Sequence, residues 1–210
     1  MSVNEDSTVQ LATQPTVAPS PGIADPGPLG LAAFALTTFL LSAANAKLMN
    51  AATGSAWLGY ALAYGGGCQL LAGMWEFRNK NVFGATAFST YGGFWIGLFL
   101  WARFVAPSAT SASAANHDVA WILLAFAIFN TYMLILSTQL NVAVFGVFLT
   151  LELTEIILFI GNFAGNSNIV QVGGYIGILT ALVAWYTSFA GVAAGIGGKI
   201  KLPVGKPLVS

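Results

Sequence analysis

The chain has 210 residues, of which 57% are hydrophobic and only 7% are charged, and its formal net charge is zero. An ordinary soluble domain carries about 25% charged residues, so this composition predicts an integral membrane protein. Without a basic excess to contact phosphates, a nucleic-acid partner is excluded. The single cysteine and single histidine cannot form an intrachain disulfide or a Cys/His metal cluster, and we expect no metal and no cofactor.

The predicted domain organisation has three parts. Residues 1–24 are rich in Ser, Thr, Pro and Ala without a hydrophobic period, which is typical of a disordered tail, and they lack the basic start of a signal peptide. Residues 25–198 form the predicted transmembrane transport domain. Residues 199–210 are predicted to be a short basic C-terminal tail with Lys199, Lys201 and Lys206.

Six apolar blocks follow the N-terminal tail, separated by short polar or Gly/Pro breaks. A helix needs about 20 apolar residues to cross a bilayer, so the predicted fold is an all-α integral membrane bundle of six transmembrane helices. The blocks cover residues 28–45, 56–75, 83–105, 119–137, 141–161 and 169–195. Small residues four apart, such as Gly173 and Gly177, predict close helix packing within the bundle or between subunits.

The orientation is predicted from the basic residues, which are more frequent in cytoplasmic loops. With six spans, the two termini share one side of the membrane with Arg78 and Lys80. That side carries the three C-terminal lysines as well, whereas the other side has only Lys47 and Arg103. Both termini are therefore predicted to be cytoplasmic.

Two acidic residues, Glu152 and Glu155, lie near the middle of the fifth apolar block. A charged side chain at that depth costs about 2.5–3.5 kcal/mol on insertion scales, so both are expected to avoid lipid. Their i, i+3 spacing places them on one helix face, and two buried carboxylates without a cation do not both ionise. Either they take up and release a proton during transport, or they are structural acids that hydrogen-bond between helices.

Uncharged polar side chains inside the apolar blocks are candidates for contact with a solute. Thr38, Gln69 and Asn162 are the substrate-binding candidates, although each alone also fits a hydrogen bond between helices. Together such groups suit a small polar or anionic solute. No nucleophile, base and orienting group occur together, so an enzyme is not expected and no catalytic residue is assigned.

Several stretches of the sequence resemble one family. Residues 25–31 with Phe34 are similar to the signature Asn-Pro-x-Pro-Leu-Gly-Leu-x-x-Phe of the acetate uptake transporter (AceTr) family, whose bacterial members are succinate–acetate permeases. Residues 65–76, 81–95 and 161–166 resemble further motifs of this family. The matching signature residues are Pro26, Pro28, Leu29, Gly30 and Leu31, and Asp25 stands where the signature has Asn.

The resemblance implies a function and an assembly. It implies a multi-pass protein of the plasma membrane, in bacteria the inner membrane, that transports acetate and other short carboxylates, in some members succinate, and forms a ring of six protomers. Proton symport and anion-channel conduction are both implied as modes. The family's hydrophobic constriction falls on Phe34, Tyr91 and Leu151; without the family, core packing is the more usual role of such residues in membrane helices.

Two other functions remain open from the sequence. A cation or ammonium pathway is favoured by Glu152 and Glu155 and by the lack of basic residues at their depth. A sensor or scaffold that moves no solute is compatible with helices and glycines alone.

Overall fold

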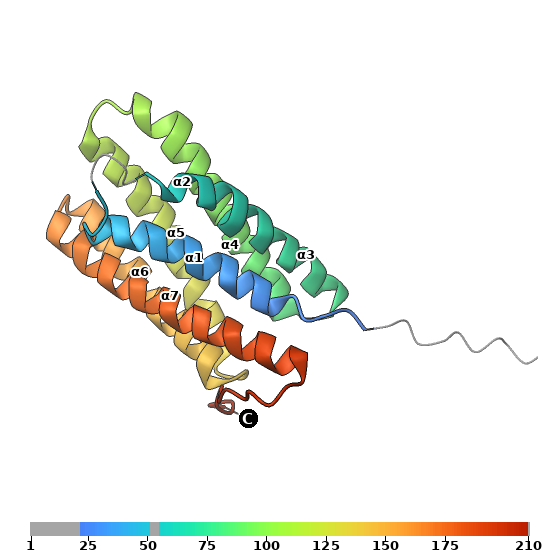
Figure 1. The fold of residues 1–210 in the computed structure, drawn as a ribbon. Helices are drawn as coiled ribbons and strands as arrows, with labels where there is room; N and C mark the ends of the chain where they lie inside the picture. The colour runs from blue at the N-terminus through green and yellow to red at the C-terminus, as the bar shows by residue number, and fades with distance from the viewer. Residues whose placement is uncertain (1–21, 51–54, 210) are drawn as a thin grey trace, which may run out of the picture.

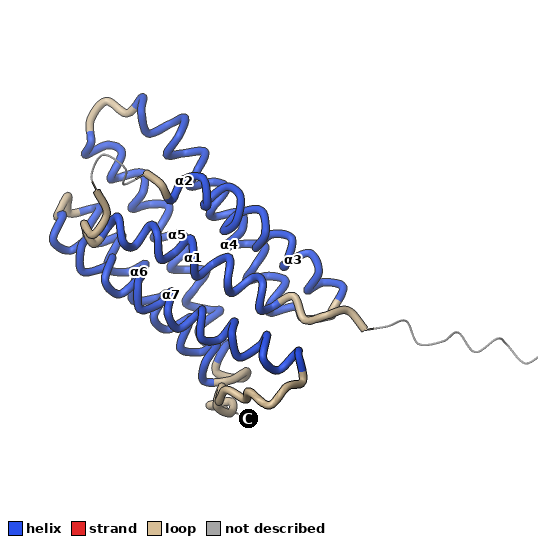
Figure 2. The backbone as a smooth tube through the Cα atoms, viewed as in Figure 1, coloured by secondary structure: helices blue, strands red, loops and turns tan. Residues whose placement is uncertain are grey.

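The computed structural model describes residues 22–50 and 55–209, and all regular secondary structure in these residues is helical (Figures 1 and 2). Most of the predicted N-terminal tail, residues 1–21, lies outside the described residues. Six continuous helical runs occur in the described part, close to the six predicted blocks. The predicted all-α membrane fold is therefore confirmed.

Four of these runs are single α-helices, each long and apolar enough to cross a membrane. They are α1 (Gly27–Asn45), α5 (Ala112–Ser137), α6 (Val142–Phe163) and α7 (Ser167–Ile196). The start of α5 was predicted at residue 119, but the helix begins at Ala112, where Ser111 caps it by accepting a hydrogen bond from the Ala114 amide at 3.1 Å. Hydropathy marks the apolar part of a helix, whereas the cap marks its end.

The other two runs change their winding along their length. The second run consists of α2 (Trp57–Tyr60), the wider π-helix η1 (Ala61–Cys68) and α3 (Gln69–Arg78). The third run consists of α4 (Val82–Leu100), the π-helix η2 (Trp101–Val105) and the 3₁₀ turn η3 (Ala106–Ser108). A π-type turn inside a helix is frequent at functional sites, and η1 contains the triple glycine of the sequence.

Glycines set the distances between several helices. A Cβ atom on Gly65 of η1 would lie 2.6 Å from Thr37 Oγ1 of α1, and one on Gly174 of α7 would lie 2.5 Å from the backbone nitrogen of Ala46. Neither distance leaves room for a side chain, so the Gly65 backbone packs against the Thr37 side chain and the Gly174 backbone packs against the backbone at the end of α1. These contacts place α1 between α7 on one side and η1 with α3 on the other.

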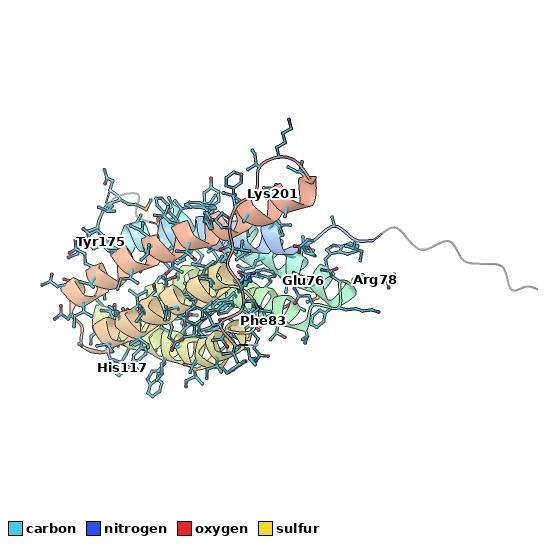
Figure 3. All side chains as sticks on the ribbon, turned by 90° about the horizontal axis from the view of Figure 1, so that it is seen from below. Glu76, Arg78, Phe83, His117, Tyr175 and Lys201 are labelled. Atoms are coloured by element: carbon cyan, nitrogen blue, oxygen red, sulfur yellow. The ribbon has the colours of Figure 1, made fainter. Side chains whose placement is uncertain are left out.

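Both described ends of the chain lie at the same end of the bundle (Figure 1). The start of α1 lies against the end of α7, where Ser188 Oγ donates to the Pro28 carbonyl at 2.7 Å. At this end Figure 3 shows Glu76 and Lys201, whereas His117 lies at the opposite end. An even number of spans produces this arrangement.

Large apolar side chains cover much of the outer surface of the bundle. Ile128 and Ile135 of α5 are 64% and 63% exposed, and Phe104 of η2 is 64% exposed. A protein in water rarely exposes so much contiguous apolar surface. In this bundle it matches the side chains that a membrane helix presents to lipid or to a neighbouring subunit.

Candidate functional site

Two cavities lie inside the bundle, one on each side of its middle. The large cavity has a volume of about 410 Å³ and is lined by the start of α1, the end of α7 and parts of α3, α4 and α6. The small cavity has a volume of about 40 Å³ and is lined by the later part of α1 together with α4, α5 and α6. The large cavity therefore faces the end of the bundle that carries both termini.

Three residues border both cavities, and they are Phe34 of α1, Tyr91 of α4 and Leu151 of α6. Their side chains are buried, with exposed fractions of 5%, 3% and 6%. The rings of Phe34 and Tyr91 meet edge to face with centroids 5.8 Å apart. The structure thus brings together at one level the three residues that the family resemblance assigns to a constriction.

The polar substrate-binding candidates separate into different places. Gln69 lines the large cavity, is 1% exposed, and its Oε1 has no hydrogen-bond partner in the protein. Thr38 lines the small cavity, and its Oγ1 has no partner either. Asn162 lines neither cavity; its Nδ2 donates to the Leu158 carbonyl at 2.8 Å within α6.

The two glutamates of α6 have different surroundings. Glu155 is 3% exposed and lines the small cavity, and its Oε1 lies 3.3 Å from the Tyr91 hydroxyl. Glu152 is half-buried and borders neither cavity. Its Oε2 accepts from Asn130 Nδ2 at 2.7 Å, and its Oε1 accepts from Thr131 Oγ1 at 2.8 Å. Of the two acids, only Glu155 both contacts Tyr91 and lines a cavity.

The hydrogen bonds around Tyr91 define where its proton lies. Asn130 Nδ2 donates to the Phe148 carbonyl and to Glu152, so Asn130 Oδ1 faces Tyr91 and accepts from its hydroxyl at 3.0 Å. A hydroxyl has a single proton to donate. The contact between Tyr91 and Glu155 is a hydrogen bond at the same time only if Glu155 carries a proton and donates it to Tyr91 Oη. The network is thus complete when Glu155 is neutral.

Acidic and amide groups gather at the mouth of the large cavity. Asp25, Glu76 and Asn81 line it, and Glu76 is 1% exposed and accepts from Asn79 Nδ2 at 3.2 Å. Glu76 is not among the residues predicted to have a role, although a carboxylate directly after an apolar block is a signal that the sequence contains. Neither cavity is lined by Lys, Arg or His from residues 22–50 or 55–209.

The signature residues begin α1 and shape the mouth. Asp25 Oδ1 accepts from the Gly27 amide at 2.9 Å, and Pro28 and Leu31 line the large cavity. Gly30 is needed for close contact, since a Cβ there would lie 2.6 Å from the Phe88 ring. Pro26 is buried, and its carbonyl accepts from the Gly30 amide. Leu29 is 45% exposed on the outer face of α1 and does not reach the cavity.

The C-terminal segment after α7 lies against the bundle. The Val204 carbonyl accepts a hydrogen bond from the Ala143 amide at 2.9 Å, and the Pro203 carbonyl accepts one from the Tyr186 hydroxyl at 2.6 Å. Leu202 and Val204 line the large cavity, and Figure 3 shows this segment, with Lys201, running back from α7 across the other helices. The segment predicted as a basic tail therefore forms part of the cavity wall.

Removing the Tyr91 hydroxyl should destabilise the protein. In Tyr91→Phe the ring remains at the constriction, but Asn130 Oδ1 and Glu155 Oε1 lose their partner, which costs about 1–3 kcal/mol per buried group. The purified variant should unfold at a lower temperature than the unchanged protein. Tyr132→Phe is the control, because Tyr132 is 48% exposed. Equal unfolding temperatures for the two variants would contradict the network.

The sequence pattern of the GPR1/FUN34/yaaH family matches residues 8–206 of the chain. The chain belongs to this family. This result confirms the resemblance to the acetate transporter family that the motifs indicated. Among solved structures, that of the bacterial acetate channel SatP matches with a TM-score of 0.80 and 31% sequence identity, and covers 87% of this chain and 99% of that chain.

Members of the family in other organisms are similar over most of this chain. Acetate permease A of Emericella nidulans is 40% identical over 198 residues, 86% of this chain and 65% of that protein. Ammonia transport outward protein 2 of Saccharomyces cerevisiae is 35% identical over 185 residues, 85% of this chain and 66% of that protein. The succinate-acetate/proton symporter SatP of Escherichia coli is 32% identical over 185 residues, 88% of this chain and 96% of that protein.

The chain spans just under two thirds of the length of the two fungal relatives and nearly all of the bacterial one. The names of these relatives denote transporters and not enzymes, in agreement with the prediction from the sequence. The fold and the family are thereby established.

Proposed function

We propose that this protein carries acetate and related short carboxylates, including succinate, across a membrane, and that each acetate moves together with a proton. The observation that supports this most directly is the trio Phe34, Tyr91 and Leu151, which borders both cavities. An apolar constriction requires a solute to lose part of its hydration. A small weak acid tolerates this better than a bulky or strongly hydrated ion.

The charges along the two cavities favour movement of acetate with a proton. The titratable side chains in their linings include the carboxyls of Asp25, Glu76 and Glu155, and no cation accompanies them among the described residues. An acetate ion that contacts the Tyr91 hydroxyl would lie about 6 Å from an ionised Glu155. At an effective dielectric constant of about 20 the repulsion is about 3 kcal/mol. A proton on either carboxyl removes this repulsion.

The names of the relatives support short carboxylates as the solutes, and they are compatible with both proton symport and conduction through an anion channel. One is named an acetate permease and another a succinate-acetate/proton symporter, and the matching solved structure is that of an acetate channel. Passive conduction of the acetate anion is the alternative mode. It requires Glu155 to stay protonated while the anion passes.

Ammonium is the second candidate solute. The carboxyls that line the cavities would attract a cation, and a yeast relative is named an ammonia transport outward protein. The aromatic and aliphatic constriction, however, offers an ammonium ion one hydroxyl and otherwise apolar side chains. We therefore place acetate first.

Flux into vesicles that contain only this protein tests the proposal. Labelled acetate should enter faster than into protein-free vesicles, unlabelled propionate should compete, and ammonium at the same concentration should not. Protein-dependent flux of ammonium without flux of acetate would establish the cation pathway. An absence of flux for both solutes would establish a sensor or scaffold that moves no solute.

We further propose a plasma-membrane location, the inner membrane in bacteria, with both termini in the cytoplasm and six protomers in a ring. Arg78 and Lys80 lie at the end of the bundle that carries the termini, and basic residues prefer the cytoplasmic side. The exposed apolar faces are suited to lipid and to neighbouring protomers. The mass of the detergent-solubilised assembly tests the ring, and labelling of an introduced terminal cysteine from each side tests the orientation.

A further inference from the structure

The small cavity is lined by three buried side chains that each carry a polar atom without a protein partner. These atoms are Thr38 Oγ1, Trp95 Nε1 and Glu155 Oε2, and the three residues are 5%, 2% and 3% exposed. Buried polar groups in proteins are almost always hydrogen-bonded to protein or to ordered water. Three such groups around one cavity point to a ligand between them.

Thr38 differs from other buried threonines of the bundle. The hydroxyls of Thr37, Thr154 and Thr180 each donate to the carbonyl four residues earlier in their own helix, at 2.8–3.0 Å. This is the usual way for a helical threonine to satisfy its hydroxyl. Thr38 Oγ1 makes no such bond, so its hydroxyl is left for a group in the cavity.

The size and chemistry of the cavity select water as the ligand. About 40 Å³ of it is open to the centres of water molecules; about 10–15 Å³ measured in this way holds one water molecule, which needs two to four polar partners. An indole N–H donates, a hydroxyl donates or accepts, and the Oε2 of a protonated Glu155 accepts. Water offers both the donors and the acceptors that these three groups need, whereas the carboxylate of an acetate ion has no proton to donate to Glu155 Oε2.

The position of the cavity connects Glu155 to one end of the bundle. Its lining follows α1 from Phe34 at the constriction to Asn45 at the helix end, a rise of about 16 Å, away from the end that carries the termini. The titratable groups that interact with Glu155 are Tyr91 of α4 and Glu152 of α6. From α1 and α7 the nearby polar groups are the hydroxyls of Ser42 and Thr180, which carry no charge.

We propose that Thr38, Trp95 and Glu155 form a water site in the small cavity, and that Glu155 exchanges its proton through this water with the solution at the end of the bundle opposite the termini. The proposal rests on proton-coupled transport as argued above. It gives the proton a route that meets the acetate route only at Tyr91, because the water binds to Oε2 while Oε1 faces the Tyr91 hydroxyl. In one turn the Oε1–H bond breaks as Glu155 gives its proton to an acetate ion at Tyr91, an O–H bond forms at Oε2 with a proton from the water, and the water regains a proton from the solution.

Threonine variants test the route in reconstituted vesicles with a pH-sensitive dye in the lumen. Thr38→Val keeps the shape and removes the hydroxyl, so proton uptake driven by added acetate should slow by about tenfold. Thr38→Ser restores a hydroxyl and should restore the rate. Thr150→Val is the matched control, because Thr150 lines neither cavity and its hydroxyl donates to the Gly146 carbonyl of its own helix. It should behave as the unchanged protein.

Infrared spectroscopy tests the water site without any transport. The carbonyl band of protonated Glu155, identified by its loss in Glu155→Gln, should shift in Thr38→Val and in Trp95→Phe and stay in place in Thr150→Val. An unshifted band in both site variants would overturn the water site, whatever the flux. Unslowed proton uptake in Thr38→Val, with uptake lost in Glu155→Gln, would overturn the route. Absence of acetate flux in the unchanged protein would instead contradict the proposed function. The infrared result would still show whether Thr38, Trp95 and Glu155 share a water site.

Discussion

Glu155→Gln should abolish acetate accumulation driven by a pH gradient and leave the protein folded. The glutamine amide can donate to Tyr91 Oη as a protonated carboxyl does, so the contacts of Tyr91 and Asn130 remain. The variant cannot release a proton, so the initial rate of acetate uptake driven by a gradient of one pH unit should fall to the rate of protein-free vesicles. Uptake of labelled acetate after an imposed pH step measures this.

Glu152→Gln is the matched control for this prediction. It makes the same chemical change one helical turn away, but Glu152 borders neither cavity and both of its oxygens accept from Asn130 and Thr131. The pH-driven uptake of acetate by Glu152→Gln should stay close to that of the unchanged protein. If Glu152→Gln loses the pH-driven uptake and Glu155→Gln keeps it, the two glutamates have the opposite roles.

Leu151→Ala should widen the range of carboxylates that pass. Leu151 borders both cavities, and shortening it removes apolar bulk from the constriction. The fit of one methylene in an apolar pocket changes discrimination by about 1–3 kcal/mol, so the ratio of lactate flux to acetate flux should rise by about tenfold or more. The two labelled acids are measured in parallel on the same vesicle preparation.

The control for Leu151→Ala is Leu153→Ala, which removes the same atoms from the same helix at a position that is 45% exposed on its outer face. The flux ratio of Leu153→Ala should not change. An unchanged ratio in both variants would place the selective constriction elsewhere in the bundle. Leu151→Val is a milder variant that keeps the test open if the alanine variant does not fold.

The number and order of the helices could be predicted from hydropathy alone, because a bilayer imposes the length of each apolar block. The winding of η1 (Ala61–Cys68) could not, since hydropathy does not report the close approach of Gly65 to Thr37 and of Gly66 to Ile96 on other helices. Likewise Ser111 determines where α5 begins, and a capping residue has no hydropathy signal.

The grouping of the three predicted constriction residues could not be predicted from local sequence patterns. Phe34, Tyr91 and Leu151 come from three helices that are far apart in the chain, and only the family motifs linked them before the structure placed them at one level. The spacing of Glu152 and Glu155 predicted a common helix face. It could not distinguish them, because their difference arises from Asn130 and Thr131 of α5 and from Tyr91 of α4.

The most direct test of the central claim applies two driving forces separately to vesicles that contain this protein. A gradient of one pH unit and a membrane potential of about 60 mV each supply about 1.4 kcal/mol for one proton or one charge. Initial rates are measured at a pH where acetate is almost fully ionised, and the rate in protein-free vesicles is subtracted. We expect acetate uptake to follow the pH gradient and to ignore the potential. Uptake that follows the potential and ignores the pH gradient would contradict proton-coupled transport and establish an anion channel.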